Sequence, residues 1–369
     1  NPTRICPQSP LQWNHYKLSV SCRLYQTKLI HYRKVKVLPE QSTPTIYGGQ
    51  AVIEGVMFGG KYVNVTAVRR KNGEISFLEV PKEDKEWVKK LRKIPLIRGI
   101  VSIVDASAKG SKHLNFSAEA MADDEMDPEE RAKQKEKEES GFSLTMLLGV
   151  AVVGILSFIV GKLIFTLVPA LLEQYLFQHA FASQTLHSLV EGVIKIVLLL
   201  GYLWLMSQTP VIKRLFQYHG AEHKVISAYE AGEELTPANV QKYSRLHYRC
   251  GSSFIILTVI VGVIIYSLPI FSWDTVWERI YIRILLLPLV IGLSFEMLRF
   301  TNAVRDIPVL RFLGYPGLWL QLLTTKEPTD DMVEVSIASF NRMRELDAQL
   351  EQVGVMETPV GTSLDPLKG

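Results

Sequence analysis

Four long apolar runs dominate the hydrophobic pattern in the second half of the chain. They cover residues 144–168, 186–206, 254–271 and 280–300, and each approaches the roughly twenty apolar residues that a helix needs to cross a bilayer. Pro288 is expected to kink the fourth run. A further run, 307–323, is interrupted by proline and glycine, and an interfacial or re-entrant segment is expected there. The pattern predicts a polytopic α-helical membrane protein with about four transmembrane helices.

The positive charges between these runs predict an orientation. The connection after the first run contains no Lys or Arg, whereas the connection after the second run is rich in both. Short loops rich in Lys and Arg stay on the cytoplasmic side of a membrane. The loop 208–252 and both chain termini are therefore expected at the cytoplasmic face of the cell membrane, with the lipid bilayer as a partner.

Ahead of the apolar runs, the pattern changes to that of a small α+β unit over residues 45–120. Val63, Val65 and Ala67 alternate with polar residues, and a second alternating stretch follows Asn72-Gly73. An Asn-Gly pair supplies the positive φ angles of a two-residue turn, so a β-hairpin is expected. Two helical pieces are expected over residues 84–93 and 96–109. The nearly all-charged stretch 121–141 is expected to be a solvated linker or an exposed helix that leads to the membrane domain, residues 142–300.

The remaining segments carry less information. Residues 1–40 are basic and show no sustained period, so a disordered or extraneous extension is expected, with a targeting peptide as the alternative. Residues 301–353 are expected to hold the interfacial segment and an amphipathic helix that begins after Thr329, a helix-capping residue. The tail, residues 354–369, is expected to be disordered.

Composition and charge give no support for a nucleic-acid-binding protein or for a protein stabilised by disulfides. Hydrophobic residues make up 47% of the 369 residues, and the net charge is +4. That charge is too small to predict nucleic-acid binding without a focused basic patch. The three cysteines, Cys6, Cys22 and Cys250, are too few for a disulfide framework.

The strongest chemical signal is the motif H-x-x-E-H, formed by His219, Glu222 and His223 between the second and third runs. On a helix the two histidines lie one turn apart on one face, where they can take adjacent positions on a tetrahedral zinc. The glutamate beside them can take a proton from a metal-bound water. The motif predicts a divalent metal, zinc in the first place, with His219 and His223 as ligands and Glu222 as general base.

Further ligands are expected nearby. A second helix is expected to open at Thr236-Pro237 and to end near His247, which would bring His247 and Cys250 to the same side as the motif. Glu296, near the end of the fourth run, is another candidate, because a carboxylate at that depth requires a partner or a metal. His247, Cys250 or Glu296 is expected to complete the site.

Each of these residues also has a structural interpretation. The histidines could cap a helix or lie at the lipid headgroups, and Cys250 could be a small buried residue. A separate set of membrane charges, Lys162, Glu191 and Lys195, is interpreted as a structural ion-pair cluster, with an ion path as the rival.

Five stretches together resemble the YqhQ-like family of uncharacterised bacterial membrane proteins. They are YGGQAVIEGVMFGG, PLIRGIVSIVDA, YHGAEHKVISAYEAG, LHYRCGSSF and PGLWLQLLTTKEPTDDMVEVSIASF, in this order over residues 45–345. The resemblance implies a bacterial cytoplasmic-membrane setting, and members of this family are sometimes described as predicted metal-dependent enzymes.

Motif and resemblance together predict a metal-dependent, hydrolytic enzyme with its site at the cytoplasmic membrane face. The alternative is a non-catalytic membrane adaptor or assembly factor whose polar loop docks a protein partner. A transporter is a weaker alternative, because no internal repeat is evident. The substrate and the oligomeric state do not follow from the sequence.

Overall fold

The structure, a computed structural model, describes residues 47–82, 86–125, 144–268, 270–271 and 275–356. Most of them belong to one compact unit, Thr45–Asp347, and only residues 348–356 belong to a second. All contacts given below lie within the first unit. The expectations for residues 1–40, for residues 126–141 of the charged linker and for the tail from residue 357 lie outside the described residues. Residues 121–125 of the expected linker and 354–356 of the expected disordered tail are helical.

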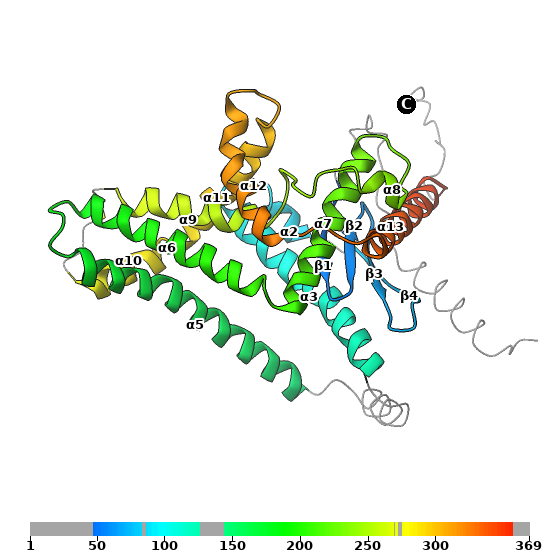
Figure 1. Cartoon of the computed structure of the whole chain (residues 1–369), viewed down its shortest axis with the longest axis horizontal. Coiled ribbons are helices and arrows are strands. Elements are labelled where there is room, and N and C mark those ends of the chain that lie inside the picture. The colour runs from blue at the N-terminus through cyan, green and yellow to red at the C-terminus, as the bar shows by residue number, and fades with distance from the viewer. Residues whose placement is uncertain (1–46, 83–85, 126–143, 269, 272–274, 357–369) are drawn as a thin grey trace, which may run out of the picture. The chain divides into compact units, whose positions relative to one another are not determined.

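A four-stranded antiparallel sheet begins the first unit (Figure 1). The strands pair in chain order, so that β1 is an edge strand; they are β1 (Gly48–Val52), β2 (Gly55–Gly59), β3 (Val63–Arg69) and β4 (Ile75–Pro81). The expected hairpin corresponds to β3 and β4. Its turn is longer than the expected two residues, because Arg70 N donates to Glu74 O and only Gly73 of the Asn-Gly pair has a positive φ, 86°. The β1–β2 hairpin in the glycine-rich segment was not predicted.

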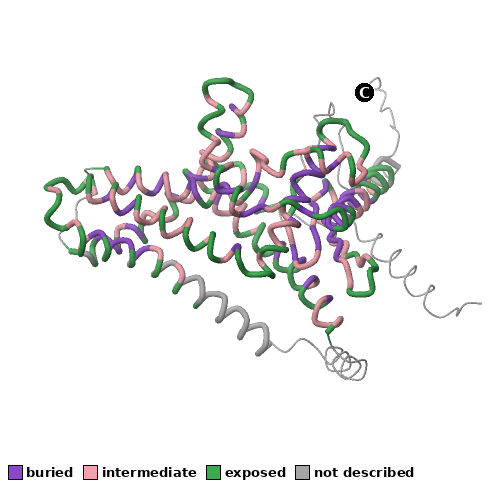
Figure 2. The backbone as a smooth tube through the Cα atoms, in the orientation of Figure 1, coloured by how far each residue is buried: buried purple, intermediate pink, exposed green. Residues whose placement is uncertain are grey.

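Two helices cover opposite faces of this sheet. On one face, Thr66 Oγ1 lies 2.6 Å from Nδ1 of His113, which belongs to α3 (Ile97–Glu125). On the other face, Ser339 of α13 (Asp330–Met356) donates to the carbonyls of two strands, and Phe340 packs edge-on against Phe58. Successive residues of a strand point to opposite faces, so β3 is buried along almost its whole length. Figure 2 shows this concentration of buried residues.

A third helix runs along the edge of the sheet. α7 (Pro210–Glu230) packs against β1 and holds the H-x-x-E-H motif. Glu54, in the turn between β1 and β2, forms an ion pair with Arg214 of α7 and accepts a hydrogen bond from Tyr218. The strand edge that carries the glycine-rich segment is thus fixed against the helix that carries the histidines.

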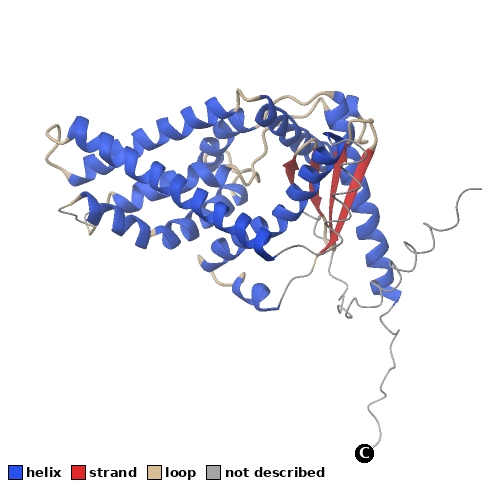
Figure 3. Ribbon diagram, turned by 90° about the horizontal axis from the view of Figure 1, so that it is seen from below, coloured by secondary structure: helices blue, strands red, loops and turns tan. Residues whose placement is uncertain are grey.

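The rest of the unit is helical (Figure 3). Two short helices, α2 (Glu86–Leu91) and α8 (Pro237–Val240), lie in connections. The apolar helices are α5 (Leu144–Phe177), α6 (Gln184–Met206), α9 (Ser253–Tyr266), α10 (Val276–Leu285) and α11 (Leu287–Ala303). A 3₁₀ turn, η1 (Leu310–Gly314), and α12 (Tyr315–Thr324) follow and lead to α13. α9 packs against α6, α11 and α12, which links the apolar helices to the segment before α13.

The prediction of about four transmembrane helices is wrong. Among the described residues, Gln184–Met206 is the one helix long and apolar enough to cross a membrane. Trp277–Leu285 and Leu287–Ala303 add a second only if this pair, bent by 51°, counts as one broken span. The run expected over residues 254–271 forms a helix of 14 residues, because the helix ends at Tyr266. The helix is thus shorter than the apolar run from which it was predicted.

Glu191, one of the three residues of the expected ion-pair cluster with Lys162 and Lys195, pairs with arginines of α10 in the structure. Glu191 is 2% exposed and forms ion pairs with Arg279 and Arg283 of α10. Arg279 also contacts Glu173 of α5, with 2.8 Å between Nη1 and Oε2. The side chain of Lys162 lies outside the described residues. Charges from three helices, distant in sequence, therefore neutralise one another, with partners for Glu191 that the sequence pattern did not predict.

Candidate metal centre

The two motif histidines lie on one face of α7, as the motif predicts. Pro210 occupies the first turn of the helix, and Gly232, with a φ of 76°, follows its end. A helix between these two residues places His219 and His223 one turn apart. Their ring centroids are 4.5 Å apart.

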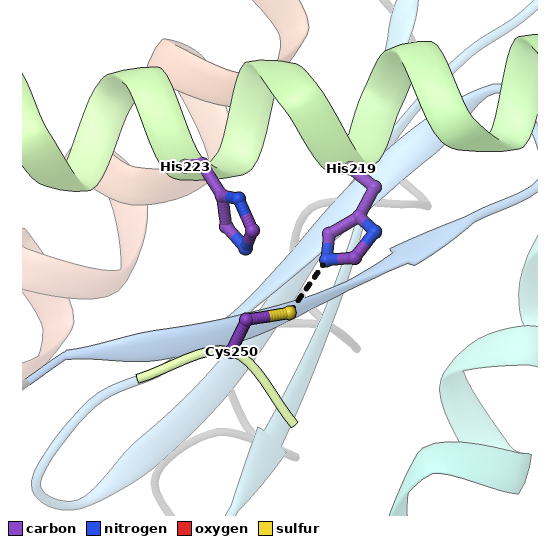
Figure 4. A group of neighbouring side chains, drawn as sticks. All are labelled: His219, His223 and Cys250. Carbon is purple, nitrogen blue, oxygen red and sulfur yellow. Dashed lines mark hydrogen bonds between the residues drawn. The ribbon is translucent and has the colours of Figure 1, made fainter. Parts of the chain in front are cut away.

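Cys250 completes a group of three potential ligands (Figure 4). It precedes α9, is 6% exposed, and its Sγ lies 3.2 Å from His219 Nε2. One ligand atom from each of the three residues lies within 4.8 Å of the other two. Three such ligand atoms can be bound by one tetrahedral zinc ion with small movements of the side chains.

Main-chain carbonyls fix the tautomer of both histidines. His219 Nδ1 lies 2.9 Å from Thr324 O, and His223 Nδ1 lies 2.6 Å from Arg245 O. Since a carbonyl oxygen only accepts hydrogen bonds, each Nδ1 carries the proton. Each Nε2 then keeps a lone pair that can bind a metal. Ligating histidines in metalloproteins are held by such outer partners.

The loop before Cys250 is held by α12. Gln321 is fully buried; its amide donates to His247 O at 2.8 Å, and its carbonyl accepts from His247 N at 2.8 Å. Arg245 donates to Thr325 O at 2.8 Å. The expected helix from Thr236 to His247 is only the single turn of α8, and these contacts with α12 order the loop instead.

Glu222 lies on the same helix and is 5% exposed. Burial raises its pKa, and the electrostatic interaction with His219 and a hydrogen bond from the main-chain N–H of Gly49 oppose that rise. A carboxyl group with a raised pKa beside a metal site can serve as a general base or acid. The position of Glu222 thus fits the role predicted from the motif.

A cavity of about 320 Å³ borders the group. Glu222, both motif histidines and Cys250 line it, as do Tyr47 and residues 48–51 of β1. The glycine-rich segment therefore has a specific place, as one wall of the cavity. The polar residues that support the ligands, such as Gln321 and Thr324, were missed in the sequence because they lie on α12, far along the chain.

The two other predicted ligands lie outside the group of three. The His247 ring centroid is 5.7 Å from that of His223, and burial, with the electrostatic interactions of His223 and Arg249, lowers the pKa of His247 to about 4. Glu296 is bound elsewhere: it accepts from Arg98 Nε at 2.6 Å and from Leu96 N at 3.2 Å. His247 thus borders the site, whereas Glu296 ties α11 to the start of α3.

Comparison with known proteins places the chain in a family. Residues 94–346 match the model of a family described as "Protein of unknown function (DUF1385)". The chain is 52% identical over 317 residues to the "Uncharacterized protein YqhQ" of Bacillus subtilis (strain 168), covering 85% of this chain and 97% of that protein. No solved structure matches. The resemblance noted in the sequence is confirmed as to family, while the membrane setting and the metal-enzyme description are not tested by these matches.

Proposed function

Because the chain belongs to the DUF1385 family of proteins of unknown function, we propose its activity from the chemistry of the site: a metal-dependent hydrolase that holds one zinc ion between His219, His223 and Cys250. The observation that carries the proposal is the anchoring of both Nδ1 atoms on main-chain carbonyls. This anchoring leaves both Nε2 lone pairs able to bind a metal, and the thiol of Cys250 lies within 4.8 Å of the histidine ligand atoms.

The donor set favours zinc over other divalent metals. A thiolate and two imidazoles are soft and borderline ligands, which suit zinc, whereas magnesium and calcium prefer oxygen ligands. Structural zinc sites have four protein ligands, and catalytic sites have three with one open position. Within the described part of the chain the group has three members and borders a cavity, which supports a catalytic site.

In the proposed hydrolysis, Glu222 transfers the proton and the metal activates the water. The metal, when bound, lowers the pKa of a water molecule and polarises the bond to be cleaved. Glu222 accepts one proton from that water as the oxygen adds to the electrophilic carbon or phosphorus of the substrate. The same carboxyl group then delivers the proton to the leaving group, so that water is consumed and two products result.

The proposed location is the cytoplasmic face of the cell membrane. α6 ends at Met206, and α7 begins at Pro210, so the candidate site follows directly on the helix that can cross a bilayer. α6 leaves Val193, Val197 and Leu205 more than half exposed, as is suitable for contact with lipid. Lys213 and Arg214 at the start of α7 favour the cytoplasmic side.

Metal analysis of the purified full chain tests this proposal. Mass spectrometry of the metal content should give about one zinc per chain. His219→Ala and His223→Ala should each lose most of it, whereas His179→Ala, at an exposed histidine in the α5–α6 connection, should keep it. Wild-type protein without metal, prepared in the absence of chelators, would contradict the proposal.

A second variant separates an enzyme from an adaptor. Glu222→Gln keeps the size of the side chain but cannot take a proton from water, so it should retain zinc and thermal stability. In cells that lack the native gene, it should fail to restore any phenotype that the wild-type chain restores. Restoration by Glu222→Gln would instead favour an adaptor, in which the loop only needs to be folded.

A further inference from the structure

Arg249, next to Cys250 in the chain, has an incompletely satisfied guanidinium group. Its Nη2 forms an ion pair with Glu230, and its side chain is 14% exposed. Its Nε is buried and has no hydrogen-bond partner among the described residues. A buried donor without an acceptor is unfavourable, and such groups in native proteins commonly bind water, ions or ligands.

This arginine borders the candidate site. Arg249 lines the same cavity as His219, His223, Cys250 and Glu222. A chain of contacts also connects it to the ligands. Glu230, its ion-pair partner, lies 3.8 Å from His247 Nε2, and the rings of His247 and His223 are next to each other.

The charges around the cavity favour an anionic ligand. Among the described residues that line it, Arg249 is the one with a permanent positive charge, and Glu222 is the one carboxyl group. β1 also lines the cavity, with Gly48, Gly49, Gln50 and Ala51, and adds no negative charge. Guanidinium groups bind carboxylates and phosphates through paired, charge-assisted hydrogen bonds.

We infer that Arg249 binds an anionic group of the substrate, a carboxylate or a phosphate, beside the bond that is cleaved. This inference rests on the proposed hydrolase and narrows its substrates to acids or phosphoryl compounds. Glu230 holds the guanidinium in place and competes with the substrate for it. Arg249 therefore determines the specificity for anionic substrates, and Glu230 lowers the affinity of Arg249 for them.

Anion titrations of the full chain test the inference. Cobalt(II) replaces zinc as a coloured probe, and inorganic phosphate, acetate and neutral acetamide are titrated while the visible spectrum and the heat of binding are recorded. Phosphate or acetate should bind, and acetamide should not. Arg249→Gln should weaken anion binding by roughly 10-fold to 100-fold, as expected for the loss of a charge-assisted hydrogen bond.

Two further variants make the test specific. Glu230→Gln frees the guanidinium and should strengthen anion binding, the opposite sign to Arg249→Gln. Lys213→Gln removes an exposed positive charge from α7, outside the cavity, and should leave the affinity unchanged. A preference for phosphate would identify a phosphoryl substrate, and a preference for acetate a carboxylate; either supports the inference.

Failure of the inference can be distinguished from failure of the metal centre. Equal anion affinity in wild type and Arg249→Gln, with cobalt retained in both, would overturn the role of Arg249 and leave the hydrolase intact. A chain that takes up no cobalt would overturn the metal centre. The heat of phosphate binding, compared between wild type and Arg249→Gln, would then still decide whether Arg249 binds anions.

Discussion

The main-chain N–H of Gly49 donates a hydrogen bond to the carboxyl group of Glu222, across 173 positions of the chain. A Cβ atom at position 49 would lie 2.4 Å from Met57 O and 3.1 Å from Glu222 Cδ. The main-chain oxygen of Met57 leaves no room for a side chain at position 49, and the carboxyl group of Glu222 lies close to the same point. This contact explains why a glycine-rich segment and a histidine motif, far apart in sequence, belong to one site.

Gly49→Ala should consequently disturb both the strand and the base. The added methyl group forces β1 or Glu222 to move, with an expected loss of about 1–3 kcal/mol in the free energy of unfolding. Gly48→Ala is the matched control, because nothing lies within 4 Å of a Cβ there, and it should change stability by less than about 0.5 kcal/mol. Thermal or denaturant unfolding of both variants measures the difference; equal stability would show that β1 can accommodate a methyl group at position 49.

Glu191→Ala should be strongly destabilising. It removes the carboxylate that neutralises Arg279 and Arg283 in a buried position, and leaving a buried charge without its partner costs about 3–5 kcal/mol. Glu191→Gln retains hydrogen bonding and should cost less. Glu233→Ala, at an exposed position after α7, serves as the control. Melting temperatures in detergent compare the three; a normal melting temperature for Glu191→Ala would favour a role in ion movement over a structural one.

His113 should make stability depend on pH. It is fully buried under β3, and burial, with a smaller contribution from the charge of Lys112, lowers its pKa to about 4. An unfolded histidine has a pKa of about 6.5, so between these values the unfolded state binds more protons. Stability should therefore fall as the pH drops from about 6.5 to about 4, by about 1.4 kcal/mol per unit of pKa difference.

The variant His113→Asn isolates this contribution. Asparagine does not titrate, so the difference in unfolding free energy between pH 7 and pH 4.5 should become smaller than in wild type. His179→Asn removes an exposed histidine and should keep the pH dependence of wild type. An unchanged pH profile in His113→Asn would mean that other groups dominate acid destabilisation.

The sequence predicted those parts of the site that depend on local geometry. The spacing of His219 and His223 determines their place on one helix face, and Cys250 lies only 31 positions beyond His219. Glu296 could not be excluded as a ligand because its partner, Arg98, is 198 positions away. Glu191 was paired with Lys195 by the local i,i+4 rule, whereas the arginines of α10 bind it in the structure.

The predicted number of membrane spans was wrong for a different reason. Apolar composition shows which residues avoid water, but it does not show where a helix breaks or bends. The break between α10 and α11 and the end of α9 at Tyr266 shorten two of the expected spans. The glycine-rich segment was likewise ambiguous, because the approach of Glu222 to Gly49 depends on packing between distant segments.

X-ray absorption at the zinc edge tests the central claim most directly. In wild-type protein the account predicts one sulfur at about 2.3 Å and two nitrogen ligands at about 2.0–2.1 Å from the metal, with a lighter atom in the remaining position. Cys250→Ser should remove the sulfur contribution and lower the zinc content, while the nitrogen contribution persists in the metal that remains. A wild-type spectrum without sulfur, or one unchanged by Cys250→Ser, would contradict a centre formed by His219, His223 and Cys250.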